Sequence, residues 1–199
     1  LTNYGYSLNG PIKIVNSNYN KNLIVNEVLV LRLTISVVII FFSYPIITFF
    51  VDESLRKILF FSLIILFTEA LNPLFYLQGI NKILPQALLN LFSKSLYILL
   101  IVLFISKVSD TYLANFFYGL SISFFFLIFW IRNHINKKII FRISFEKLIR
   151  NLKENFKFFL STTYTHFTLN SALLILNFFV TDKELGRFTL AFKIAFLLR

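Results

Sequence analysis

Long uninterrupted apolar runs constrain the fold of this chain more than any other feature. A helix needs about 20 residues to cross the roughly 30 Å hydrocarbon core of a bilayer. Five runs reach that length, at residues 28–51, 58–78, 84–106, 112–131 and 158–180. Each run is continuously apolar, whereas the strands of a membrane barrel alternate polar and apolar positions over about ten residues. The sequence therefore predicts an all-α, polytopic membrane helix bundle, in which Pro45 and Pro73 kink their spans.

The composition supports this prediction and excludes several functions. Of the 199 residues, 57% are hydrophobic and 15% are charged, whereas a soluble domain carries about 25% charged residues. The sequence has no cysteine and no motif of a zinc protease, a serine hydrolase or a nucleotide-binding loop. We therefore expect neither an enzyme nor a resident metal or cofactor. Because the chain has no methionine and ends inside an apolar run, we expect it to be a fragment of a longer product.

The net charge of +11 predicts the orientation of the spans. Nucleic-acid binding is one interpretation of such an excess, but the basic residues lie in the loops between apolar runs, as cytoplasmic loops require. Loops alternate sides, and eleven basic residues fall on the side that includes residues 132–157, against five on the other. We therefore expect a multi-pass protein of the cell (inner) membrane, with residues 132–157 in the cytoplasm and no nucleic-acid partner.

Residues 132–157 separate the fourth run from the fifth and are rich in basic residues. Within them apolar residues repeat at helical spacing, and Ser144 can cap the start of a helix. This pattern predicts an amphipathic helix on the anionic inner leaflet, where each basic residue contributes on the order of 1 kcal/mol of attraction. A plain cytoplasmic loop is the alternative.

Ionisable residues inside the predicted spans indicate more than anchoring, because each costs several kcal/mol unless it is paired or hydrated. Glu69 and Lys94 both lie about 15 Å deep if their helices are regular, and a tight turn joins their spans. We therefore predict an ion pair between them. Asn72 and Asn90 form a second polar level nearer the inner end. A purely structural role in helix packing is the alternative.

Polar side chains also share single faces of other spans. Arg32 and Ser36 begin such a face in the first span, and His166 and Asn170 lie on one in the fifth. Several helices with one polar face each predict a polar cavity between them, which favours transport. For His166 alone, a buried, hydrogen-bonded histidine is the alternative to a proton relay.

Three segments resemble a known family. Residues 72–82, NPLFYLQGINK, followed by NLFSK at 90–94, resemble the LQG-x-x-K region and the following span of Wzx-type O-antigen flippases. Residues 4–10 and 184–195 are similar to two further segments of these polysaccharide exporters. The chain departs from the family at Asn81, where glutamate is frequent, and at Arg187 and Thr189, which replace a tyrosine-containing pattern.

The resemblance implies a partial two-lobe exporter fold, with five of about twelve transmembrane helices present. It divides the chain into the end of a preceding span with a cytoplasmic loop (1–27), four helices of the N-terminal lobe (28–131), a basic inter-lobe linker (132–157) and the start of the C-terminal lobe (158–199).

The resemblance also implies translocation of undecaprenyl-pyrophosphate-linked oligosaccharide units for O-antigen or capsule synthesis. The implied partners are this lipid-linked oligosaccharide, membrane lipids, a polysaccharide polymerase and a chain-length regulator. Arg32 and Lys94 are the candidate pyrophosphate ligands. The candidate cavity residues are Glu69, Asn72, Asn90, His166 and Asn170. The alternatives are a drug extruder, a teichoic-acid or lipid II flippase, a polysaccharide polymerase and a lipid-linked glycosyltransferase.

Overall fold

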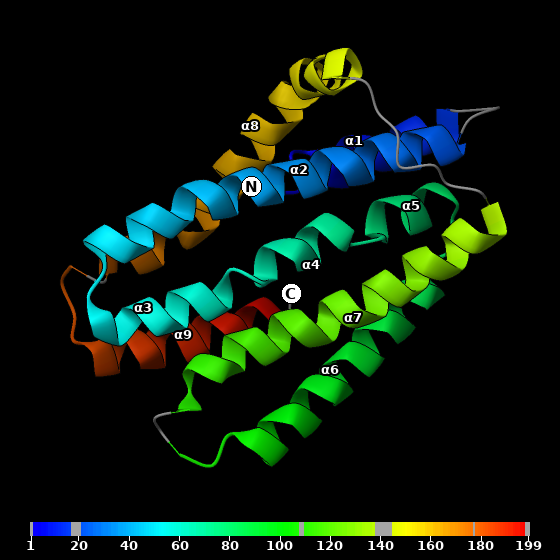
Figure 1. The fold of residues 1–199 in the computed structure, drawn as a ribbon. Helices are drawn as coiled ribbons and strands as arrows, with labels where there is room; N and C mark the ends of the chain where they lie inside the picture. Colours follow the sequence, from blue (N-terminus) through cyan, green and yellow to red (C-terminus); the bar gives the residue numbers. More distant parts are fainter. Residues whose placement is uncertain (1, 17–20, 108–109, 138–144, 177, 198–199) are drawn as a thin grey trace. The chain divides into compact units, whose positions relative to one another are not determined.

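The computed structural model covers the whole chain, and it describes residues 2–16, 21–107, 110–137, 145–176 and 178–197 (Figure 1). These residues form helices and turns with no β-strand, which confirms the all-α prediction for the described part of the chain. The helices are α1 (Tyr6–Asn16), α2 (Lys21–Phe50), α3 (Glu53–Ser62), α4 (Ile65–Leu71), α5 (Leu74–Gly79), α6 (Leu84–Phe104), α7 (Tyr112–Lys137), α8 (Phe145–Leu176) and α9 (Asp182–Leu197).

Four stretches of the described chain are long and apolar enough to cross a membrane. They are Lys21–Phe50, Leu55–Gly79, Leu84–Phe104 and Tyr112–Asn133, and they match the first four predicted spans. The predicted fifth span is not among them. It is helical up to Leu176 as the later part of α8, but polar residues interrupt its apolar character, so it stays a prediction.

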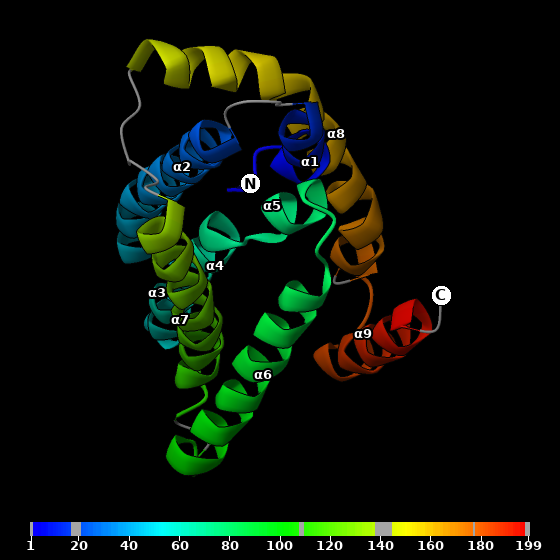
Figure 2. The same ribbon diagram turned by 90° about the vertical axis from the view of Figure 1, so that its right-hand side faces the viewer.

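The chain divides into two compact units, Leu1–Phe159 and Leu160–Arg199. In the first unit α6 and α7 lie side by side, α7 also packs on α3 and α4, and α1 packs on α5 (Figures 1 and 2). Helix α2 contacts α1, α3 and α4. These contacts place α1 beside the last turns of the second candidate span, Leu55–Gly79.

The core of the first unit is formed by buried apolar and aromatic residues of α1, α2, α5 and α7, among them Tyr6, Phe75 and Trp130. Close packing of α1 on α5 requires glycine, because a Cβ atom on Gly79 would lie 2.7 Å from the Cβ of Ile14. This packing holds α5 against α1.

The predicted amphipathic linker helix is observed from Phe145 as the first part of α8. Residues 138–144, including the predicted cap Ser144, lie outside the described residues. The apolar face of the helix is divided: Leu152 packs against the core, whereas Ile149 and Phe156 are 38% and 49% exposed. Contact of this exposed edge with the inner leaflet stays a prediction.

The second unit contains the rest of α8 and the helix α9. The start of α9 has half of a capping box, since the backbone N–H and the hydroxyl of Thr181 donate to Glu184 Oε2 at 3.0 and 2.9 Å. The backbone bond has the larger effect, and the two bonds together hold the pKa of the Glu184 carboxyl below its ordinary value.

Candidate functional site at a broken helix

The second candidate span is interrupted at Asn72 and Pro73, between α4 and α5. Proline has no backbone N–H to continue the helical hydrogen bonds, and its ring clashes with the preceding turn. The side chain of Asn72 starts α5 instead, because its Oδ1 accepts the N–H of Leu74 at 3.1 Å. The carbonyls of Leu71 and Asn72 instead accept hydrogen bonds from side chains of other helices. The break confirms the prediction from Pro73, whereas α2 continues through Pro45.

Two buried side chains from neighbouring helices supply those donors. Arg32 of α2 donates from Nη1 to the carbonyl of Asn72 at 3.1 Å. Trp130 of α7 donates from Nε1 to the carbonyl of Leu71 at 2.6 Å. The two side chains are 2% and 3% exposed. An unpaired backbone carbonyl is costly inside a bilayer, so these bonds allow the broken helix to persist.

Arg32 is a positive charge enclosed within the first unit. Its Nη2 donates to Asn3 Oδ1, and its Cζ lies 4.7 Å from the ring centroid of Phe75 and 5.9 Å from that of Tyr6. Among the described residues no carboxylate forms an ion pair with it, although Glu69 is near enough to act on it electrostatically. Aromatic faces and carbonyl dipoles therefore stabilise this charge.

Two polar atoms of this cluster lack hydrogen-bond partners within the described structure. They are Nε of Arg32 and the hydroxyl of Tyr6, both buried. Native proteins leave few buried polar atoms without a hydrogen-bond partner. The guanidinium is closed to a large ligand in this conformation, so its predicted role as a pyrophosphate ligand stays a prediction.

The predicted level of Asn72 and Asn90 is connected through a third side chain. Nε2 of buried Gln86 lies 3.5 Å from Asn72 Oδ1 and 3.3 Å from Asn90 Oδ1. This row links the break to α6. The polar face of α6 that contains Gln86 and Asn90 could be found from the sequence, but the bridging position of Gln86 depends on where the break falls.

The predicted ion pair of Glu69 with Lys94 is not formed in the described structure. Both side chains are exposed on the first unit. The prediction assumed a regular helix over 58–78, but this span is divided into α3, α4 and α5. At Asn72 the backbone leaves the helical region, with ψ 114°, so equal depth in sequence does not bring the two charges together.

His166 and Asn170 lie on α8 in the second unit, and both are exposed. The side chain of Asn170 donates to the carbonyl of His166 at 2.7 Å within the same helix. No group of three or more His, Asp or Glu side chains in the described residues is placed to hold a metal ion.

The sequence did not identify the role of Trp130. Its sequence signal was weak, because a tryptophan near the end of a span is ordinarily an interfacial anchor.

Comparisons with protein-family models, with curated proteins and with solved structures found no match.

Proposed function

We propose that this protein is a flippase of the inner membrane, which moves an undecaprenyl-pyrophosphate-linked oligosaccharide from the inner to the outer leaflet. The observation that carries the proposal is the break at Asn72 and Pro73, inside a candidate span, held by the buried cation of Arg32. On this proposal the chain works with a polysaccharide polymerase and a chain-length regulator.

The break favours transport over anchoring for a physical reason. A continuous helix satisfies its own backbone and is sufficient for an anchor. Discontinuous helices with polar neighbours are typical of the binding regions of membrane transporters. Here Asn72, Gln86 and Asn90 extend the polar region from the break to α6.

The charge of the region favours an anionic headgroup. A pyrophosphate carrying sugars cannot cross hydrocarbon unaided and needs fixed positive groups in a polar environment. Arg32 lies at the break, and Lys94 is exposed on α6. The segment that resembles Wzx-type flippases, residues 72–82, contains the break itself and all of α5.

The test is complementation of cells that lack their own polysaccharide flippase, with surface polysaccharide as the readout. The decisive variant is Pro73→Ala, which restores the N–H that a continuous helix needs. Its matched control is Pro45→Ala, because α2 is already continuous at that position. We expect the wild type and Pro45→Ala to restore surface polysaccharide, and Pro73→Ala to fail at equal membrane abundance.

Two results would contradict the proposal. Full export by Pro73→Ala would show that the break has no part in transport. Failure of the wild type to export polysaccharide, combined with rescue of cells depleted of their lipid II flippase, would instead assign the protein to the alternative substrate.

A further inference from the structure

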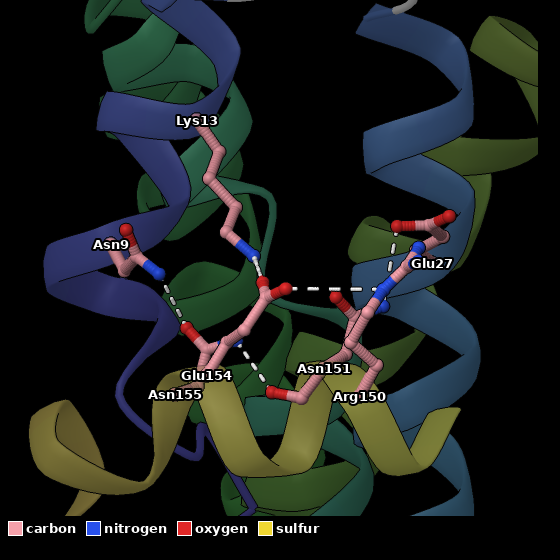
Figure 3. Close-up of polar contacts among 7 residues, drawn as sticks. All are labelled: Asn9, Lys13, Glu27, Arg150, Asn151, Glu154 and Asn155. Atoms are coloured by element: carbon pink, nitrogen blue, oxygen red, sulfur yellow. Dashed lines mark hydrogen bonds and ion pairs between the residues drawn. The ribbon is translucent and has the colours of Figure 1, made fainter. Parts of the chain in front are cut away.

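The first turns of α8 are held on α1 by polar side chains (Figure 3). Asn9 donates from Nδ2 to Asn155 Oδ1 at 2.6 Å. Lys13 Nζ lies 2.8 Å from Glu154 Oε2 in an ion pair. Asn155 is fully buried, and its own amide donates to the carbonyl of Asn151 at 2.8 Å. A helix predicted as a linker is thus attached to the N-terminal helix.

The same turns of α8 are also held on α2. Asn151 donates from Nδ2 to Glu27 Oε2 at 3.2 Å (Figure 3). Lys147 Nζ lies 3.8 Å from Glu27 Oε1. Asn151 is 4% exposed. We call Lys147, Asn151, Glu154 and Asn155 the docking face of α8. Its partners on α1 and α2 are polar or charged as well.

A contact of a different kind lies at the end of this segment. Gly5 has φ +76°, and a Cβ atom there would lie 2.6 Å from Phe158 Cβ and 2.7 Å from the backbone nitrogen of Phe159. The ring of Tyr4 stacks on that of Phe159 at 4.7 Å. Here backbone packs on backbone, directly before the boundary between the two units at residues 159 and 160.

The two contacts differ in how readily they separate. Hydrogen bonds and ion pairs of the docking face can be exchanged for bonds to water, so the net contribution of each to stability is small. Interfaces that move within a chain are accordingly more polar than permanent ones. The glycine contact offers no such exchange, because its surfaces are close-packed. Leu152, which lies between these residues, packs against the core, so opening exposes one apolar side chain besides the polar contacts. The docking face can therefore open while the Gly5 contact stays.

We propose that the docking face of α8 is a latch, which releases from α1 and α2 in each transport cycle and turns about the Gly5–Phe158 contact. This inference rests on the proposed function for its role in transport. Helix α8 continues without interruption past the latch to Leu176. Opening of the latch thus acts on the helix that leads into the second unit.

The experiment uses the purified protein in proteoliposomes, in a background free of other cysteines. Asn9→Cys with Asn155→Cys is treated with a short bis-thiosulfonate cross-linker, which ties α1 to α8 and is removed by reduction. The matched control is Lys153→Cys with Lys157→Cys, since these exposed residues lie one turn apart on α8 and outside the docking face. Transport is followed with a fluorescent short-chain polyprenyl-pyrophosphate trisaccharide. We expect loss of transport for the first pair only, with recovery on reduction.

A second measurement does not depend on transport. Single Asn155→Cys is exposed to a water-soluble maleimide, with exposed Lys153→Cys as the reference for the same helix. The latch predicts slow but complete labelling of Asn155→Cys in the folded protein. Labelling only after denaturation, or unchanged transport by the cross-linked pair, overturns the latch. Absence of transport by the untreated protein with normal labelling of Asn155→Cys would instead overturn the proposed substrate.

Discussion

The hydrogen bond from Trp130 to the broken helix gives a prediction with a defined magnitude. Replacing Trp130 by its benzothiophene analogue keeps the ring shape, its stacking with Phe75 at a centroid distance of 6.1 Å and its tilted contact with Tyr76 at 5.8 Å. The exchange removes only the Nε1–H donor to Leu71, which acts over 2.6 Å.

The expected loss of stability follows from the acceptor that remains without its donor. The carbonyl of Leu71 would be left unsatisfied, at a cost of about 1–3 kcal/mol in soluble proteins. Hydrogen bonds within membrane proteins have a smaller measured value, about 0.6 and at most about 1.7 kcal/mol. Because Trp130 is only 3% exposed, water cannot easily take the place of its N–H as the donor to the carbonyl of Leu71. We therefore expect a loss of about 1–2 kcal/mol, close to where these two ranges overlap.

The assay is unfolding by sodium dodecyl sulfate in mixed micelles, followed by far-UV circular dichroism. The analogue is introduced by codon suppression. As a control, tryptophan and the analogue are each placed at the position of Phe124, which is 51% exposed. We expect these two proteins to have the same stability. Equal stability of the two proteins at Trp130 would refute the view that this bond holds the break.

Three further changes test other parts of the structure. Arg32→Gln should lower the stability to dodecyl sulfate by about 1–3 kcal/mol together with export, and Arg32→Lys should retain part of both; unchanged stability would indicate a ligand role alone. Gly5→Ala should lower the melting temperature, because its Cβ meets the α8 backbone, whereas Gly186→Ala has no atom within 4 Å and should not; equal melting temperatures would argue against the close packing. Asn136→Cys should be protected from an impermeant thiol reagent in intact cells and labelled after lysis, as eleven basic residues against five require; labelling of intact cells would reverse the topology.

Four candidate spans and the break between α4 and α5 could be predicted from the sequence. Transfer of an apolar side chain into lipid is favourable whatever its neighbours are, so run length alone marks a span. The missing N–H of Pro73 is equally local, because it is a covalent property. Pro45 lacks the same N–H and yet α2 continues through it, so the sequence did not show which proline would break its helix.

The partners of the polar side chains were decided by the tertiary structure alone. Glu69 and Lys94 appeared matched along regular helices, yet the divided span leaves both exposed and unpaired with each other. The sequence predicted Arg32 as a pyrophosphate ligand, which stays a prediction, and only the fold showed that its guanidinium bonds to Asn3 and Asn72.

For the docking face of α8, too, the sequence predicted one part and the tertiary structure decided the other. The amphipathic pattern of this segment predicted its helix, but two asparagines among basic residues did not indicate that they would be buried against α1 and α2. Hydrogen bonds and ion pairs act over a few ångströms and depend on orientation, so they are determined only when helix rotation, close packing at glycine and the position of the break are set together. Burial of apolar surface has no such directional requirement, and for that reason the sequence alone was enough to predict the spans.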